Sequence, residues 1–140
     1  MSITVTDLTH IYNPGQPAEQ TALDRISFHV EDGSFVGLIG HTGSGKSTLV
    51  QHLNGLLKPT SGTIHIGETD ITKAGAASRA ARLTTGLVFQ YPEYQLFEET
   101  VARDVAFGPA NLGLDQEEID LRVREAIGLV GLDYDKVKNL

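Results

Sequence analysis

Eight consecutive residues, 40–47, constrain this 140-residue chain more than any other segment. They read Gly-His-Thr-Gly-Ser-Gly-Lys-Ser and match the pattern G-x-x-x-x-G-K-S/T. Backbone N–H groups in such a loop point inward together, and the helix that follows adds its positive end, so the loop holds phosphate groups. Gly40, Gly43 and Gly45 permit backbone angles and close approaches that a Cβ would block. A chance match in a chain of this length has odds of about one in a hundred. The pattern therefore predicts a P-loop.

The segments around the loop support this prediction. Residues 35–39 form a continuous apolar run, which is typical of a strand covered on both faces. Residues 46–56 carry apolar side chains at helical spacing, and Gly55 lies near the expected helix end. Residues 87–89 predict a second buried strand. Strand, loop and helix in this order are the arrangement that a P-loop requires.

The sequence before the loop predicts an antiparallel sheet. Residues 3–8 and 23–30 alternate apolar and polar side chains, as half-buried strands do. Residues 13–17 and 31–33 have the composition of turns. Residues 63–66, between two glycines, predict a further short strand.

The rest of the chain is predicted to be mainly helical. Residues 76–83 are rich in Ala and Arg. Asp115 is placed to cap a helix, with Glu118 at the third position and a Leu114–Ile119 contact across the cap. The apolar stripe expected on this helix consists of Ile119, Val123, Ile127 and Val130.

The composition limits the kinds of binding partner that we expect. The formal net charge is −7, with eleven Lys and Arg scattered along the chain, so a nucleic-acid partner is not expected. The absence of cysteine excludes disulfides and thiolate metal sites. No apolar run approaches the roughly 18 residues that a membrane span needs. We therefore expect no direct membrane span.

Individual residues of the loop have predicted roles toward ATP and Mg²⁺. Lys46 reaches the β- and γ-phosphates as a point charge, and the Ser47 hydroxyl is placed to coordinate Mg²⁺. Thr48 lies at the same helix start and can touch phosphate. His41 is expected to contact phosphate through its backbone rather than to transfer a proton.

Three features of the chain resemble ABC-transporter nucleotide-binding subunits. Tyr12 matches the family's aromatic residue that stacks on adenine, residues 40–47 match its Walker A loop, and Gln90 matches its Q-loop glutamine. Residues 89–113 are more specific and look like the ATPases of energy-coupling factor (ECF) transporters and their cobalt- and nickel-import relatives.

The resemblance implies a nucleotide site with Ser47 and Gln90 near Mg²⁺. Its members are Tyr12, Gly40, His41, Thr42, Gly43, Ser44, Gly45, Lys46, Ser47, Thr48 and Gln90. It also implies an ATP-binding subunit that pairs with a second ABC ATPase subunit. In the family, the pair drives a transmembrane coupling subunit and a substrate-capture subunit from the cytoplasmic face of the membrane. The substrates are vitamins or transition-metal ions.

Several alternatives stay open. Tyr12 can simply pack on the sheet, and Gln90 can be an ordinary strand-end glutamine. The aromatic and apolar residues after Gln90 fit either a helical core or an interface with the membrane subunit; they are Tyr91, Tyr94, Leu96 and Phe97. The whole chain can instead represent a soluble, non-transport ABC-type ATPase, or a binding fragment without turnover.

The chain departs from the family pattern toward its end. It has no LSGGQ-like signature, no apolar strand that ends in Asp-Glu, and no downstream switch histidine. Residues 127–133 mimic a Walker B strand, but two glycines interrupt them and Tyr134 follows where Glu is needed. No catalytic residue is therefore assigned, and negligible hydrolysis by these residues alone is expected.

The predicted fold class is α/β. It comprises a P-loop NTPase core with an N-terminal antiparallel β-subdomain and the start of an α-helical subdomain, as in an incomplete ABC ATPase domain. Residues 1–90 are expected to form the first two parts. Residues 91–140 are expected to hold the Q-loop and the beginning of the helical subdomain. The sheet edge left open predicts marginal stability or aggregation.

Overall fold

The computed structural model describes all 140 residues, which divide into two compact units, Met1–Leu87 and Val88–Leu140. The first unit holds the sheet and the P-loop, and the second is helical. None of the helices combines the length and the apolar character that crossing a membrane requires.

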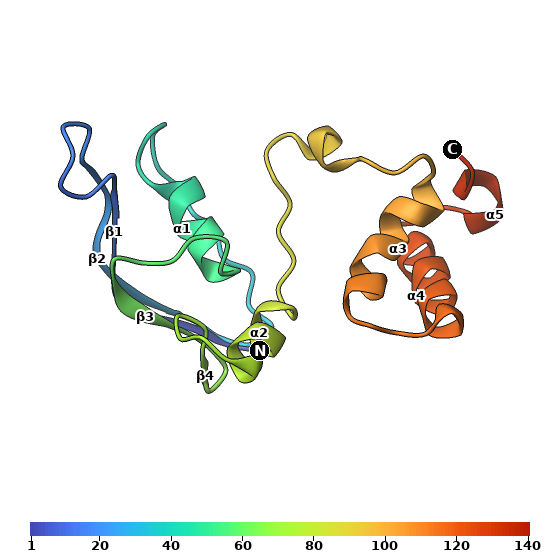
Figure 1. Ribbon diagram of the computed structural model, residues 1–140, viewed down its shortest axis with the longest axis horizontal. Helices are drawn as coiled ribbons and strands as arrows, with labels where there is room; N and C mark the ends of the chain where they lie inside the picture. Colours follow the sequence, from blue (N-terminus) through green and yellow to red (C-terminus); the bar gives the residue numbers. More distant parts are fainter. The chain divides into compact units, whose positions relative to one another are not determined.

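The first unit is built on a four-stranded antiparallel sheet with the order β2-β1-β3-β4 (Figure 1). Its strands are β1 (Ile3–Tyr12), β2 (Gln20–Val30), β3 (Ser61–Ile66) and β4 (Thr69–Asp70). The predicted N-terminal antiparallel sheet is confirmed, because the alternating segments pair as expected.

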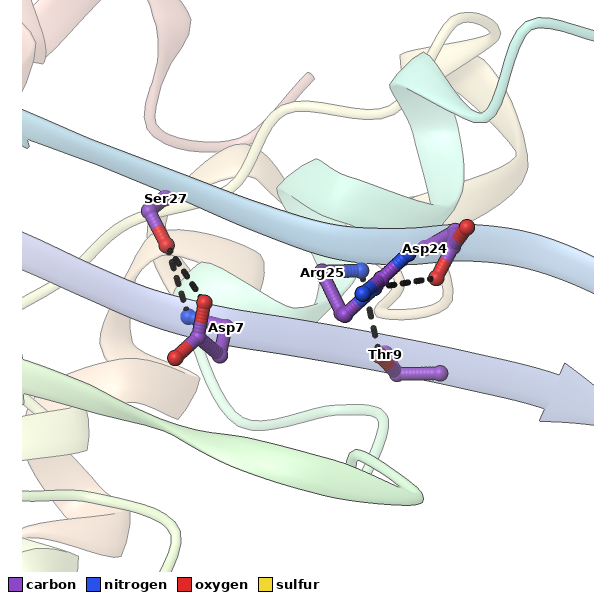
Figure 2. A network of polar contacts seen from close by, with 5 residues as sticks. All are labelled: Asp7, Thr9, Asp24, Arg25 and Ser27. Carbon is purple, nitrogen blue, oxygen red and sulfur yellow. Dashed lines mark hydrogen bonds and ion pairs between the residues drawn. The ribbon is translucent and has the colours of Figure 1, made fainter.

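The pairing of β1 with β2 is irregular, and this irregularity sets which residues face inward. Asp7 and Arg25 both have a φ of 47°, in the left-handed region. Figure 2 shows how side chains replace the missing ladder bonds: the Asp7 N–H donates to Ser27 Oγ at 2.8 Å, and the Arg25 N–H donates to Thr9 Oγ1 at 3.1 Å. The break at Asp7 lets Val5 and Leu8, three residues apart, both face the core.

Helix α1 (Lys46–Leu53) covers the inner face of this sheet. Leu49 is buried in one cluster with residues of β1, β2 and β3. Fully burying an aliphatic side chain of this kind stabilises the fold by about 1.5–3 kcal/mol. The other buried members of the cluster are Val5, Leu8, Leu23, Ile64, Ile66 and Ile71. The core of this unit therefore fixes the P-loop helix against the sheet.

The C-terminus of α1 lies against helix α2 (Ala76–Arg82). Helix α1 ends three residues before the predicted residue 56, and Gly55 follows with a φ of 74°. A Cβ on Gly55 would lie only 2.0 Å from Arg82 Cδ, so the Arg82 side chain crosses directly over this glycine. The Arg82 guanidinium donates to the Ile71 carbonyl at 3.0 Å. This arrangement places a cation at the negative end of the P-loop helix.

Two predicted strands, at residues 35–39 and 87–89, are wrong. Neither segment pairs with a strand, and Ile39 and Val88 are 96% and 79% exposed. A strand needs neighbours that satisfy its N–H and C=O groups, and no strand of these 140 residues pairs with either segment. The apolar runs are therefore present without the sheet that would cover them.

The second unit comprises the short helix η1 (Pro92–Gln95) and the helices α3 (Val101–Asn111), α4 (Gln116–Leu129) and α5 (Tyr134–Val137). The predicted cap of α4 is confirmed, because the Asp115 carboxylate accepts from the Glu118 N–H at 2.9 Å. Leu114 packs against the cluster that contains Ile119, as the predicted contact across the cap requires.

Three members of the predicted stripe on α4, namely Ile119, Val123 and Ile127, form the core of this unit. The prediction is wrong for the fourth member, Val130, because this residue lies at the C-cap and is 72% exposed. The rejection of residues 127–133 as a Walker B strand is confirmed, since α4 runs on to Leu129.

The aromatic segment after Gln90 does not form a core in this structure. Tyr91, Tyr94, Leu96 and Phe97 are all exposed. Phe97 makes an edge contact with Phe107 of α3, with ring centroids 4.7 Å apart. The interpretation of these residues as helical core is therefore wrong, and their role as an interface stays a prediction.

Candidate nucleotide-binding site

The loop of residues 40–47 has the backbone that the glycines were predicted to allow. Gly43 and Gly45 have φ values of 82° and 85°, in the region that favours glycine. A Cβ on Gly40 would lie 2.6 Å from Ser44 Oγ, so the loop is closed tightly on itself. Helix α1 starts directly after Gly45, at Lys46.

Gly45 also lets the loop pack closely against strand β2 of the sheet. A Cβ at this position would lie 2.6 Å from the Ala22 carbonyl oxygen and 3.1 Å from Leu23 Cδ2. Both neighbours belong to β2. Only glycine allows the start of the helix to approach the strand this closely, so β2 determines where the loop lies.

Lys46 extends back across the loop. Its ammonium group donates to the carbonyls of Gly40 and His41, each at 2.8 Å, and lies 3.4 Å from Ser44 Oγ. The His41 ring donates through Nδ1 to the Thr42 carbonyl at 2.8 Å. The positive charge is therefore held at the loop, where an anionic ligand would meet it.

The donor set of the loop fits a phosphate group and Mg²⁺. The N–H groups of Gly43, Gly45 and Lys46 donate to no other group of the protein. They lie at the positive end of α1, where anions are stabilised. The Ser47 side chain is exposed and makes no hydrogen bond, so its hydroxyl is free to coordinate a cation.

Tyr12 lies beside the start of α1, although 36 positions separate it from Thr48 in sequence. Its hydroxyl is 3.1 Å from Thr48 Oγ1, and the side chain is 36% exposed. The structure thus brings Tyr12 and Thr48 together within the first unit. Stacking of Tyr12 on adenine stays a prediction.

Gln90 belongs to the second unit and lies in an irregular segment with an exposed side chain. Its predicted role near Mg²⁺ also stays a prediction.

The sequence analysis missed two histidines behind the loop. His52 of α1 is fully buried, His10 of β1 is 9% exposed, and His52 Nε2 lies 3.1 Å from His10 Nδ1. Burial lowers the pKa of His52 below its ordinary 6.5, while its bond to the Thr48 carbonyl acts in the opposite direction. Spacing in the sequence gave no signal, because 42 positions separate the two residues.

The glycine-rich loop leads directly into a helix, its lysine bonds back to the loop carbonyls, and the loop packs against a sheet. This arrangement defines a P-loop nucleotide-binding protein. Residues 23–140 match the family described as ABC transporter. The chain therefore belongs to the ABC transporter ATPase family.

The most similar relatives include ATP-binding proteins of energy-coupling factor transporters. The chain is 59% identical over 139 residues to EcfA2 of Clostridioides difficile (strain 630) and 55% identical over 139 residues to EcfA2 of Clostridium tetani (strain Massachusetts / E88). These matches cover 99% of this chain and 48% of each relative. The chain thus spans about half the length of the curated relatives it matches.

Solved structures agree with the assignment to the ABC ATPase family. The cbiO1 protein of Clostridium perfringens, described as part of the ABC transporter complex cbiONQ, matches with a TM-score of 0.77 and 35% identity over 98% of this chain and 52% of its own. The ATP-binding cassette MJ0796, as a dimer bound to ADP and Pi, matches with a TM-score of 0.80 and 24% identity over 98% of this chain and 60% of its own. At that identity the second likeness shows the fold alone. The ABC ATPase fold is therefore confirmed.

Proposed function

We propose that this chain supplies the ATP-binding loop of an ECF-type ABC importer ATPase. The observation that carries this proposal is the formed P-loop, in which Lys46 is held by two loop carbonyls at 2.8 Å while neighbouring N–H groups remain free. The relatives named EcfA2, matched along 99% of the chain, support the assignment to this transporter type.

On ATP binding, Lys46 exchanges its loop carbonyls for the β- and γ-phosphate oxygens. The N–H groups of Gly43, Gly45 and Lys46 donate to the same phosphates, and Ser47 ligates Mg²⁺. Tyr12 would stack on adenine, and Gln90 would serve as a further residue for Mg²⁺. Mg²⁺ neutralises phosphate charge and stabilises the charge that develops during phosphoryl transfer.

We further propose that the protein works at the cytoplasmic face of the membrane as a peripheral subunit. It pairs with a second ABC ATPase subunit, a transmembrane coupling subunit and a substrate-capture subunit. The substrate is a vitamin or a transition-metal ion. The names of the relatives support the transporter type, and the description of cbiO1 as part of a cbiONQ complex supports assembly with other subunits.

Calorimetry with Mg·ATP tests the site directly. The wild-type chain is compared with Lys46→Ala and with the matched control Lys58→Ala, which removes an exposed lysine of the same unit that forms no ion pair. We expect Lys46→Ala to weaken binding by about tenfold to a hundredfold, as loss of a charge-assisted contact worth roughly 1.5–3 kcal/mol predicts. Equal affinity of Lys46→Ala and wild type would refute the site.

We also propose that these 140 residues bind ATP without sustained turnover. The sequence contains no strand that ends in Asp-Glu, so it offers neither the second Mg²⁺ ligand nor the carboxylate that orients the attacking water. Phosphate release from Mg·ATP is measured for wild type and Lys46→Ala. Sustained release that depends on Lys46 would contradict this proposal.

A further inference from the structure

Four residues, two of the P-loop helix and two of β1, form a closed ring of contacts. The Tyr12 hydroxyl lies 3.1 Å from Thr48 Oγ1, and the Thr48 carbonyl lies 2.7 Å from His52 Nδ1. His52 Nε2 lies 3.1 Å from His10 Nδ1. The His10 ring meets the Tyr12 ring edge-on, with centroids 4.5 Å apart and an interplanar angle of 82°. Tyr12 is therefore held at two points, through its hydroxyl and through its ring.

With His52 neutral, the contacts set the proton positions of both histidines. A carbonyl only accepts, so His52 Nδ1 carries a proton, and Nε2 of the neutral ring accepts from His10 Nδ1. His10 Nε2 then carries no proton, and this buried nitrogen has no hydrogen-bond partner. A proton added to His52 Nε2 would force His10 to accept at Nδ1 and to bury an unpaired N–H at Nε2 instead.

We propose that His10 and His52 are positioning residues that hold Tyr12 for the base of the nucleotide, and so set how much of the affinity depends on adenine. This inference rests on the proposed function. His10 supports the Tyr12 ring from β1, while His52 fixes the first turn of α1, where Thr48 receives the Tyr12 hydroxyl. Neither histidine contacts residues 40–47, so we expect their loss to change phosphate binding much less than base binding.

The surroundings of His52 favour its neutral form. A cavity of about 210 Å³ beside His52 is lined by four cationic side chains and no carboxylate; these are Lys58, Lys73, Arg79 and Arg82. From β1, His10 meets the His52 ring on one side and the Tyr12 ring on the other. The cavity therefore offers no carboxylate to stabilise a charged ring, and burial lowers the pKa of His52. Protonation of His52 would leave a buried, unpaired N–H at His10 Nε2, so acid weakens the ring of contacts.

The test compares Mg·ATP with Mg·tripolyphosphate, which carries the phosphates without the base. Calorimetry gives the ratio of the two dissociation constants for wild type and for His10→Phe/His52→Leu. The double substitution removes both polar groups together, and such paired replacements can be nearly neutral for stability. Ile71→Val, in the same core but outside the ring, is the matched control.

We expect wild type to prefer ATP by about tenfold to a hundredfold, the range that one stacked base supplies. The double variant should lose most of this preference and keep its affinity for tripolyphosphate. In a Tyr12→Ala background the histidine changes should have no further effect on the ratio. On acidification from pH 8 to 5.5 the ratio should fall in wild type and stay flat in the double variant.

Other outcomes separate the two proposals. Absence of Lys46-dependent binding of either ligand to wild type refutes the proposed function and this inference with it. Binding of both ligands with an unchanged ratio in the double variant refutes only the positioning role. An equal loss of both affinities also refutes it, because the histidines would then support the fold and not the base.

Discussion

Replacing Gly45 by alanine adds one methyl group at the point where the P-loop rests on β2. The new Cβ would lie 2.6 Å from the Ala22 carbonyl oxygen, which belongs to the sheet backbone and cannot move aside cheaply. The residue would also keep a φ of 85°. The substitution therefore combines a steric clash with a strained backbone.

Gly43→Ala separates these two effects. Gly43 has nearly the same φ, 82°, but a Cβ there meets no atom within 4 Å. A left-handed conformation costs an L-residue about 1–2 kcal/mol, which is the loss expected for Gly43→Ala. Overpacking adds about 1–3 kcal/mol, so Gly45→Ala should lose about 2–5 kcal/mol of unfolding free energy.

Urea unfolding followed by circular dichroism measures the loss of unfolding free energy in each variant relative to wild type. The midpoint should fall about 1.5- to fourfold further for Gly45→Ala than for Gly43→Ala, with an unchanged slope. Equal midpoints for the two variants would show that the contact between Gly45 and β2 does not constrain the loop, and the anchoring argument would be lost.

Three further predictions concern the core of the first unit, the cap of α4 and the pKa of Asp70. Leu8→Ala should lower the unfolding free energy by about 2–5 kcal/mol, whereas Leu121→Ala, at an exposed site, should change it by about 0.5 kcal/mol or less; urea melts distinguish them. Asp115→Ala removes the cap of α4 and should cost about 1 kcal/mol, seen as faster amide exchange in its first turn. Burial alone would raise the pKa of Asp70, but hydrogen bonds from Thr72 lower it below its usual 3.8. Its contribution is thus present above that value and lost as the pH falls through the folded pKa, and Thr72→Val should raise the pKa in an NMR titration.

In His52 the fold favours the neutral form, whereas in Asp70 it favours the charged form, so the two groups affect stability in different pH ranges. Its folded pKa is lowered because burial disfavours the charged ring. Between this value and 6.5 the unfolded chain binds more protons, so stability rises with pH there. The stabilisation from a neutral His52 is complete above the unfolded value and is lost as the pH falls below 6.5.

Much of the P-loop could be predicted from the sequence because its geometry is local. Gly43 and Gly45 adopt the positive φ that only glycine accepts readily, and the helix begins at the next residue. The cap at Asp115 was predictable for the same reason, since a capping carboxylate and its N–H lie three residues apart. Such features need no partner from elsewhere in the chain.

Strand prediction succeeded only where the chain supplies a partner. Residues 3–8 and 23–30 alternate, and the strands β1 and β2 that contain them pair with each other. Residues 35–39 and 87–89 have the apolar composition of buried strands but remain unpaired. Composition indicates what a segment can become, whereas the ladder of hydrogen bonds depends on a second segment.

The sequence by itself determined the phosphate-binding loop and the cap of α4, because each follows from neighbouring residues. The tertiary structure alone decided that Tyr12 reaches Thr48, that Gly45 rests on β2, and that His10 meets His52. The contacts of Tyr12 and His10 depend on the irregular register at Asp7, which changes the face on which the following residues of β1 lie. Strict alternation would place His10 and Tyr12 on the face away from α1, so only the folded sheet brings them to the nucleotide site.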